Sequence, residues 1–199
     1  MIPGIVLAAG KSSRMGRTKA LLPIGERETF LSRVVDTLRT GGVEDVIVVV
    51  GAERDAIQTA VAEAGMAVRV VENRDYELGQ LSSLVAALHT IDRPGVTAAL
   101  VTLIDVPLVA SATVSTLLQE YRAGAALIVR PTRGGRHGHP VIFDRALFDE
   151  LRRANPKEGA KEVLRAYSAE QLNVEVCDEG AFTDIDTPED YERFIVNRC

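Results

Sequence analysis

A segment near the start of the chain combines glycines, small hydroxyl residues and cations directly after an apolar run. From Leu7 to Lys19 it reads Leu-Ala-Ala-Gly-Lys-Ser-Ser-Arg-Met-Gly-Arg-Thr-Lys. Glycines let backbone amides approach a ligand closely, and clustered amides bind phosphate oxygens. Arg14 and Lys19 would neutralise a triphosphate held in such a loop. The alternative is a solvated basic loop, but the position after a buried strand favours ligand binding.

Two well-known phosphate-binding loops do not fit this segment. The Walker A pattern needs four residues between its glycines, followed by Lys and then Ser or Thr. Here five residues separate Gly10 from Gly16, and Arg17 follows. The dinucleotide fingerprint Gly-x-Gly-x-x-Gly is absent, and the second apolar run ends at Gly51 instead of an acidic residue.

Acidic residues that could complete a phosphate site lie far downstream. Asp105 follows the apolar run Ala98–Leu103 and precedes Pro107, so a turn-forming role is the plain alternative. Asp184 and Asp186 are spaced to share one face of an extended segment. Thr187, by contrast, is explained as the cap of a following helix. A carboxylate facing a triphosphate needs a cation between them, and Mg²⁺ is the natural candidate, with Mn²⁺ as an alternative.

Apolar runs alternate with amphipathic segments in the first half of the chain, which predicts an α/β fold. Helical patterns end at Gly41, Gly65 and Gly124, where a glycine commonly stops a helix. The continuous apolarity of the runs suits parallel strands that are covered on both faces. We therefore predict a doubly wound three-layer sandwich with a mostly parallel sheet. The runs are Gly4–Ala9, Asp45–Val50, Ala67–Glu72 and Ala98–Leu103.

The expected strand order places the basic loop and Asp105 together. In an open α/β sheet, ligands bind outside the carboxyl ends of the strands, where the strand order reverses. With the order 3-2-1-4, that crevice lies between the first and fourth strands. The loop that carries Lys19 and the turn that carries Asp105 would then flank one cleft.

The second half of the chain is less regular, and its expected elements are shorter. Strands are predicted at 125–129, 140–143 and 172–176, and helices at 145–154, at 159–169 and from Pro188 onward. The segment between the first two of these strands, Pro131–His139, is rich in Gly and Arg and is predicted to be a loop. Residues 1–199 are predicted to form a single domain, with a nucleotide-binding half at 1–110 and an acceptor-binding half at 111–199.

Composition excludes several classes of protein. The formal net charge of the 199 residues is -5, so no global basic field would attract nucleic acid. The two cysteines, Cys177 and Cys199, suggest neither a metal clip nor a disulfide framework. We find no signal peptide and no apolar stretch of membrane-spanning length, so a cytoplasmic protein without membrane contact is expected.

The opening Leu-Ala-Ala-Gly-Lys-Ser-Ser-Arg-Met-Gly-x-x-Lys-x-Leu-Leu-Pro resembles that of the molybdenum-cofactor nucleotidylyltransferases. Similar openings occur in sugar-phosphate and methylerythritol-phosphate nucleotidylyltransferases. The resemblance implies a Rossmann-like nucleotidyltransferase fold, with catalytic roles for Arg14, Lys19 and Asp105. It also implies that Asp105 and Asp186 bind the metal, with Asp184 as a further candidate. The nucleotide-binding residues that it implies are Leu7, Ala8, Ala9, Gly10, Ser12, Ser13, Gly16, Asn73, Gly79, Ser82 and Ser83.

The resemblance also bears on the two substrates. The cytidylyltransferases of this family tend to carry Ala-Ala-Gly where its guanylyltransferases carry Ala-Gly-Gly, so Ala9 favours CTP over GTP. The segment from Gly135 to Pro140 resembles an acceptor-side element, which implies that Arg136 and His139 contact the acceptor. A solvated basic loop is the alternative there. Pro156–Lys161 departs from the family's Gly-Asp-x-Gly-Ala-Arg pattern, which leaves the acceptor open.

The predicted function is Mg²⁺-dependent transfer of a nucleotide to a phosphorylated small molecule, with release of pyrophosphate. CMP from CTP is the first candidate for that nucleotide. Molybdopterin is the first candidate acceptor, and a sugar phosphate or polyol phosphate is the second. A non-catalytic module that binds nucleotide or delivers a cofactor is a third hypothesis of a different class. The resemblance also allows a transient contact with a molybdoenzyme.

Overall fold

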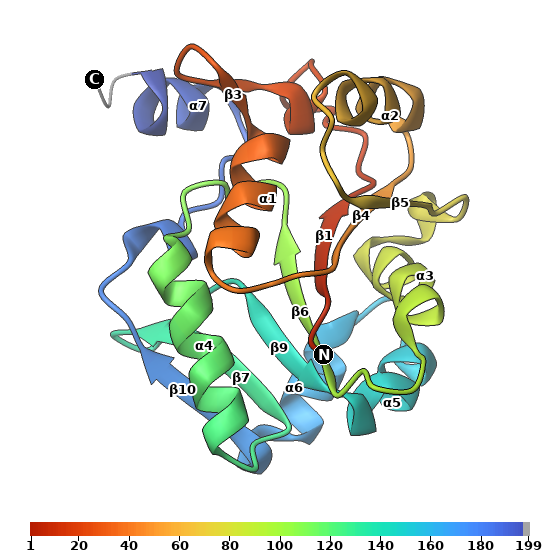
Figure 1. Ribbon diagram of the computed structural model, residues 1–199, viewed down its shortest axis with the longest axis vertical. Coiled ribbons are helices and arrows are strands. Elements are labelled where there is room, and N and C mark those ends of the chain that lie inside the picture. The colour runs from red at the N-terminus through yellow and green to blue at the C-terminus, as the bar shows by residue number, and fades with distance from the viewer. Residues whose placement is uncertain (197–199) are drawn as a thin grey trace.

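A computed structural model describes residues 1–196 of the chain. Within those residues, eight strands form one mixed sheet in the order β10-β7-β9-β6-β1-β4-β5, with β8 paired to β7. Figure 1 shows β1 between β6 and β4 in the middle of the molecule. The strands are β1 (Gly4–Ala8), β4 (Val46–Val50), β5 (Arg69–Glu72), β6 (Ala98–Leu103), β7 (Ile128–Arg133), β8 (Arg136–His137), β9 (Val141–Asp144) and β10 (Gln171–Glu175). A separate hairpin pairs β2 (Pro23–Ile24) with β3 (Glu28–Thr29).

Helices cover both faces of the sheet, which gives the three predicted layers. Apolar side chains of α1, α2 and α4 pack in one core cluster, and those of α3, α5 and α6 pack in the other. The central strands β1 and β4 are buried along their whole length, as expected for strands covered on both faces. The helices are α1 (Phe30–Thr40), α2 (Arg54–Glu63), α3 (Gln80–Ile91), α4 (Ser111–Ala123), α5 (Phe148–Arg153), α6 (Ala160–Ala166) and α7 (Pro188–Phe194).

The first half of the sheet confirms the predicted strand order. In chain order the first four sheet strands are β1, β4, β5 and β6, and they lie side by side as 3-2-1-4 with parallel pairing. The second half adds antiparallel pairs, because β9 lies between β6 and β7 and runs against both. The carboxyl ends of β1 and β6 therefore meet at one edge of the sheet, as the site requires.

Some predicted boundaries in the second half were wrong. Strand β7 begins at Ile128, not Ala125, and runs through Pro131 to Arg133, inside the predicted loop. Pro131 fits there because β7 pairs with β9 only at Ile128 and Val129, and with β8 only from Thr132 onward. The missing N–H of the proline thus falls between two antiparallel partners, where the ladder does not need it. The predicted helix at 145–154 begins as a short 3₁₀ turn, and α6 ends at Ala166.

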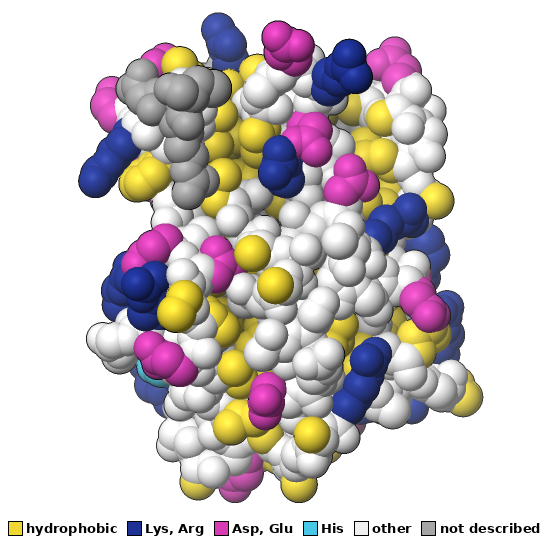
Figure 2. All heavy atoms as spheres, turned by 60° about the vertical axis from the view of Figure 1, so that its left-hand side comes forward, with side chains coloured by type: hydrophobic (Ala, Val, Ile, Leu, Met, Phe, Trp, Pro, Cys, Tyr) yellow, Lys and Arg dark blue, Asp and Glu magenta, His cyan; other side chains and the backbone are white. Residues whose placement is uncertain are grey.

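Charges of both signs are interspersed on the face shown in Figure 2, with no extended field of either sign. This distribution agrees with the modest net charge of the whole chain. Within the described residues, the helices all lack the length and apolar character needed to cross a membrane. Cys177 is exposed and free, and Cys199 lies outside the described residues.

Asp92 at the end of α3 ties this helix to α5 and gives a testable pH dependence. It pairs with Arg152 at 2.7 Å and with Arg145 at 2.8 Å. The hydrogen bond from Arg152 holds the pKa of Asp92 below its usual range. A depressed carboxyl pKa contributes stability above the unfolded-state pKa, and that stability is lost as pH falls through the folded-state pKa.

We expect Asp92→Asn to lower the free energy of unfolding at neutral pH by about 0.5–1 kcal/mol, the range of partly exposed ion pairs. Urea unfolding of both proteins at neutral and acidic pH checks this. The difference should shrink below the ordinary pKa of Asp. A difference that stays constant down to acidic pH would show that packing, not charge, links the two helices.

Candidate active site

Lys19 joins two aspartates that are far apart in the sequence. Its ammonium Nζ lies 2.7 Å from Oδ1 of Asp186 and 3.6 Å from Oδ2 of Asp105. The Lys19 side chain is only 10% exposed, so the ammonium is largely removed from water. Arg14 adds a second cation, 3.1 Å from Oδ2 of Asp186. The basic loop and both predicted acidic positions therefore converge on one place, as the sequence predicted.

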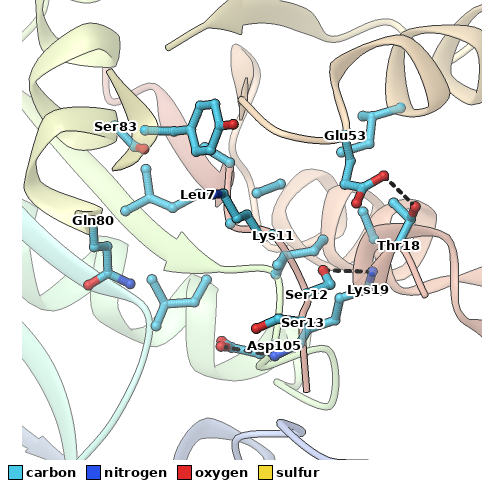
Figure 3. A pocket seen from close by; sticks show the side chains of 18 of the residues that line it. Leu7, Lys11, Ser12, Ser13, Thr18, Lys19, Glu53, Gln80, Ser83 and Asp105 are labelled. Carbon is cyan, nitrogen blue, oxygen red and sulfur yellow. Dashed lines mark hydrogen bonds and ion pairs between the residues drawn. The ribbon is translucent and has the colours of Figure 1, made fainter. Parts of the chain in front are cut away.

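The loop after β1 holds its shape through local hydrogen bonds. Ser12 adopts a left-handed backbone conformation with φ of 48°, which is uncommon for a residue other than glycine. Its carbonyl accepts from the Met15 N–H at 3.0 Å, and its hydroxyl accepts from the Lys19 N–H at 3.1 Å. Thr18 donates to Glu53 at 2.9 Å and so ties the loop to the start of α2. Figure 3 shows these two side-chain contacts beside Asp105.

Residues 178–186, near the end of the described chain, position Asp186 beside Lys19. Asp178 anchors its start by accepting from the Ala110 N–H and the Thr113 hydroxyl. Its backbone then pairs with two neighbouring loops, since Ala181 O accepts from His139 N and Ile185 N donates to Asp105 O, each at 2.8 Å. Helix α7 fixes the end through the predicted Thr187 cap.

Close approach along this segment depends on glycine. A Cβ placed on Gly180 would lie 1.9 Å from the carbonyl oxygen of Leu108, and one on Gly138 would lie 2.1 Å from that of Ala181. Real side chains do not tolerate such distances, so residues 178–186 can thread between the Asp105 turn and the His139 loop only with glycines there. The position of Asp186 is therefore set by contacts from both halves of the chain.

The two aspartates differ in their electrostatic surroundings. The hydrogen bond from Lys19 lowers the pKa of Asp186, and Arg14 adds to that effect. Burial raises the pKa of Asp105, the charge of Lys19 opposes this only in part, and the charges of Asp184 and Asp186 raise it further. The difference follows first from the burial of Asp105 and then from distance, because the ammonium is closer to Asp186. Asp105 is therefore the carboxylate that still lacks positive charge.

A divalent cation fits these residues. Within residues 1–196, the buried Oδ1 of Asp105 has no hydrogen-bond partner. The described residues contain no group of three His, Cys, Asp or Glu side chains arranged to hold a metal by themselves. Two carboxylates with further oxygens from a phosphate are the arrangement that Mg²⁺ favours. Asp105 and Asp186 suit a cation that arrives with a nucleotide, better than one held by protein alone.

Two cavities open at this edge of the sheet. The first, of about 340 Å³, surrounds the loop after β1 and is called the loop cavity. The second, of about 1030 Å³, lies toward β9 and α6 and is called the wide cavity. Three lining residues, Leu7, Gln80 and Leu103, belong to both, so the two cavities meet there. Figure 3 shows Gln80 and Ser83 on the α3 side of the loop cavity.

Most of the predicted site residues line the loop cavity. They are Leu7, Ala8, Ala9, Gly10, Ser12, Ser13, Arg14, Lys19, Gly79, Ser83, Asp105 and Asp186. Asp184 is exposed and lines neither cavity, and Gly16 also lies outside both. Gly16 instead serves the loop conformation, with φ of 63°. The division at residue 110 stays a prediction, and Asp186 comes to this cavity from the second half.

Asn73 and Ser82 have structural roles. The buried Asn73 side chain accepts from the Asp75 N–H at 3.0 Å and donates to both Ser82 and Ser83. The Ser82 hydroxyl donates back to carbonyls of Asp75 and Gly79. These contacts shape the turn before α3, so neither residue lines a cavity. Helix α3 begins at Gln80, with Gly79 as its cap.

The two predicted acceptor residues separate in the structure. His139 lines the wide cavity, and its Nδ1 has no hydrogen-bond partner within residues 1–196. Burial lowers the pKa of His139, which favours a neutral imidazole. Arg136 lines neither cavity, because it pairs with Glu179 at 2.9 Å and lies over the ring of Phe182. Its guanidinium therefore links the β7–β8 hairpin to residues 178–186.

Several cavity residues were not foreseen from the sequence. The loop cavity also contains Lys11, Glu53 and Tyr76. The wide cavity also contains Arg165. It is lined as well by Arg130, Lys157 and Lys161, three cations from stretches that the sequence already offered for the acceptor. Each unforeseen loop-cavity residue follows the carboxyl end of a strand at this edge, and that position was the available signal.

Comparison with known proteins agrees with this geometry. Residues 4–172 match the profile of the MobA-like NTP transferase domain. The chain belongs to the MobA-like NTP transferase family. The resemblance seen in its opening motif is thereby confirmed, and so is the predicted fold class.

Individual relatives extend over nearly the whole chain. It is 32% identical to nicotine blue oxidoreductase of Paenarthrobacter nicotinovorans, covering 98% of this chain and 96% of that one. It is 28% identical to molybdenum cofactor guanylyltransferase of Rhizobium meliloti, covering 94% and 88%. The crystal structure of Rv0371c from Mycobacterium tuberculosis H37Rv superposes with a TM-score of 0.80, at 32% identity and 98% coverage of both chains. A manganese complex of that protein superposes at 0.72, with 31% identity and 98% coverage of both.

These matches support a nucleotidyltransferase. The family profile names nucleoside triphosphate transfer, and the relative from Rhizobium meliloti is a guanylyltransferase. The manganese complex shows that one similar protein binds a divalent metal. The nucleotide, the acceptor and the metal that this chain uses are matters for proposal.

Proposed function

We propose that this nucleotidyltransferase transfers CMP from CTP to a phosphorylated acceptor, with molybdopterin as the first candidate, and releases pyrophosphate. The observation that carries the proposal is the convergence of Lys19, Asp105 and Asp186 at the mouth of the glycine loop. Such a set of one buried cation and two carboxylates suits a triphosphate with a divalent ion.

The loop cavity supports the donor assignment. Its cations Arg14 and Lys19 lie on the same side as the backbone of Gly10 to Ser13. Ala9 takes the position at which the family's guanylyltransferases tend to have glycine, and it lines this cavity. A methyl group there disfavours the larger purine, although one methyl is a modest discriminator in a pocket.

The wide cavity supports the acceptor assignment. It adjoins the loop cavity at Gln80, so a ligand in it could reach the donor. Arg130 and Lys161 line it and offer positive charge for a phosphate. Its floor includes Val101, Val141 and Phe143, which offer apolar surface to the body of an acceptor.

The chemistry needs no protein base. A phosphate monoester has a second pKa of about 6, so the acceptor is largely a dianion at neutral pH. One of its oxygens forms a bond to the α-phosphorus, and the bond from that phosphorus to the oxygen bridging to the β-phosphate breaks. Arg14, Lys19 and the loop amides stabilise the charge that develops on pyrophosphate. A divalent ion held by Asp105 and Asp186 would supply further charge stabilisation at the α-phosphate.

The donor is tested by titration calorimetry with CTP and GTP in the presence and absence of Mg²⁺ or Mn²⁺. We expect CTP to bind about tenfold more tightly than GTP, in line with one methyl group of discrimination. Binding of both should weaken when EDTA removes the divalent ion. Equal or stronger binding of GTP would replace cytidylyl with guanylyl transfer.

The reaction is tested by pyrophosphate release with the preferred nucleotide and a panel of acceptors. Molybdopterin, a sugar phosphate and a polyol phosphate separate the acceptor classes. Release that depends on one acceptor identifies it. Nucleotide binding without release across the panel would instead indicate a binding or delivery module without catalysis.

Redox activity is a second candidate, because one relative at 32% identity is named an oxidoreductase. The missing dinucleotide fingerprint and the partly uncompensated charge of Asp105 favour transfer over redox chemistry. The test is oxidation of NADH or NADPH with an added quinonoid acceptor. Turnover there, with no pyrophosphate release in the first assay, would favour the redox function.

A further inference from the structure

The loop cavity has one aromatic wall. Among the lining residues that the structure describes, Tyr76 alone is aromatic. It begins the 3₁₀ turn Tyr76–Leu78 between β5 and α3, and its side chain is half-buried against the core. In the described part of the chain we find no hydrogen bond to its hydroxyl group. The residue therefore presents its ring to the cavity and uses no polar contact to do so.

The ring is fixed at its base by tight packing. Gly51 follows β4, and a Cβ placed there would lie 2.6 Å from the carbonyl oxygen of Ala9 and 2.7 Å from Cβ of Tyr76. Glycine at this position thus lets Tyr76 pack directly against the turn after β4, which also lies against the carbonyl of Ala9. An aromatic residue held in this way loses little conformational freedom when a ligand stacks on it.

The ring is also reachable from the loop side. The ammonium of Lys11 lies 5.9 Å from the centroid of the Tyr76 ring and pairs with Glu77 at 2.5 Å. Both side chains of that ion pair are exposed. A flexible side chain from the loop therefore reaches over this ring.

The sheet order places the ring and the charged group on opposite sides of β1. Tyr76 packs at the ends of β1 and β4, whereas Asp105 follows β6 on the other side of β1. Neighbouring strands lie about 4.8 Å apart, so about two strand spacings separate β4 from β6. A ligand whose phosphates lie at Lys19 and Asp105 thus has its far end beside Tyr76.

We propose that Tyr76 is the surface on which the base of the donor nucleotide stacks. The inference rests on the proposed function, because it takes the loop cavity as the nucleotide site. Stacking uses the π-face that every base has, so Tyr76 supplies affinity and positioning for both CTP and GTP. Discrimination between the two bases must come from other groups, such as Ala9.

The test compares Tyr76→Leu with Tyr76→Phe by titration calorimetry in Mg²⁺, using CTP, GTP and inorganic tripolyphosphate. Leucine keeps apolar packing but removes the ring face, and phenylalanine keeps the ring. We expect Tyr76→Leu to weaken CTP and GTP about tenfold each, the scale of base–aromatic stacking. Tripolyphosphate should bind to it as to the original chain, and Tyr76→Phe should bind all three ligands normally.

The outcomes separate this inference from the proposed function. Tyr76→Leu that binds CTP within about twofold of the original chain would overturn the stacking role alone. An equal loss for tripolyphosphate would do the same, because it would show that Tyr76 only shapes the loop. An original chain that binds neither nucleotide would overturn the proposed function and this inference together. Thermal unfolding of each variant confirms that the fold is intact.

Discussion

Asp105→Ala should lose nearly all turnover while the protein stays folded. We expect pyrophosphate release to fall roughly a hundredfold to a thousandfold, the loss seen when one group that stabilises transition-state charge is removed. Among residues 1–196, Oδ1 of Asp105 is buried and has no hydrogen-bond partner, so Asp105 is the site carboxylate most in need of a cation. Steady-state pyrophosphate release at saturating nucleotide measures the effect. Wild-type turnover would remove Asp105 from the mechanism.

Removing the charge of Asp105 should not destabilise the protein. The pKa of Asp105 is raised chiefly by burial, so its ionised form opposes folding at neutral pH. Asp105→Asn removes that charge and keeps the shape, and we expect an unfolding temperature equal to or above that of the original chain. Asp149→Asn, at a carboxylate that is 73% exposed, is the control and should retain turnover. A clear loss of stability in Asp105→Asn would show that Asp105 is structural.

Lys19→Met should have the second large effect, on both activity and stability. The substitution removes the ammonium that lies between Asp105 and Asp186 and leaves two carboxylates without it. Breaking a buried ion pair costs about 3–5 kcal/mol, and the partial exposure of Asp186 reduces this to roughly 1–3 kcal/mol. For a chain of this size the unfolding temperature should fall by roughly 2–10 °C. Turnover should be lost because the triphosphate loses a cation.

Two further measurements show whether charge causes the loss. Adding Asp186→Asn to Lys19→Met should restore part of the stability and none of the activity. Mg²⁺ or Mn²⁺ without nucleotide should stabilise Lys19→Met more than the original chain, because the ion can replace the missing ammonium. Lys161→Met, at an exposed lysine, is the stability control. A Lys19→Met protein as stable as the original, and indifferent to divalent ions, would contradict this account.

The first half of the fold could be predicted because its signals are local. Runs such as Val46–Val50 are apolar at every position, and the ends of α1 and α2 are followed by the glycines Gly41 and Gly65 that the sequence displays. Strand β7 could not be delimited in the same way. A proline usually ends a strand. Only the register in which β8 and β9 pair with β7 shows that the missing N–H of Pro131 costs the sheet no hydrogen bond.

The site residues that could be predicted were those whose chemical type has one main role at their position in the fold. Lys19 and Asp105 follow buried strands at one edge of the sheet, and their chemistry has few alternatives there. Arg136 shows the limit, since its partners Glu179 and Phe182 come more than 40 residues later. From the sequence alone, an arginine in a loop could equally bind a substrate or form a structural ion pair, because its partner in the fold is not known. Asn73 was ambiguous for the same reason, because its bonds to Ser82 and Ser83 depend on the turn between them.

The threading of residues 178–186 past the Asp105 turn has a consequence for how the protein is made. A nascent chain leaves the ribosome from its N-terminus, so β1, β4, β5 and β6 can pair early, and Lys19 is then present without Asp186. The carboxylate closest to that ammonium, that of Asp186, emerges 167 residues after Lys19. The complete site therefore forms only after residue 186 has been made, and ribosome-bound fragments that stop before it contain the cationic loop without its main counter-charge.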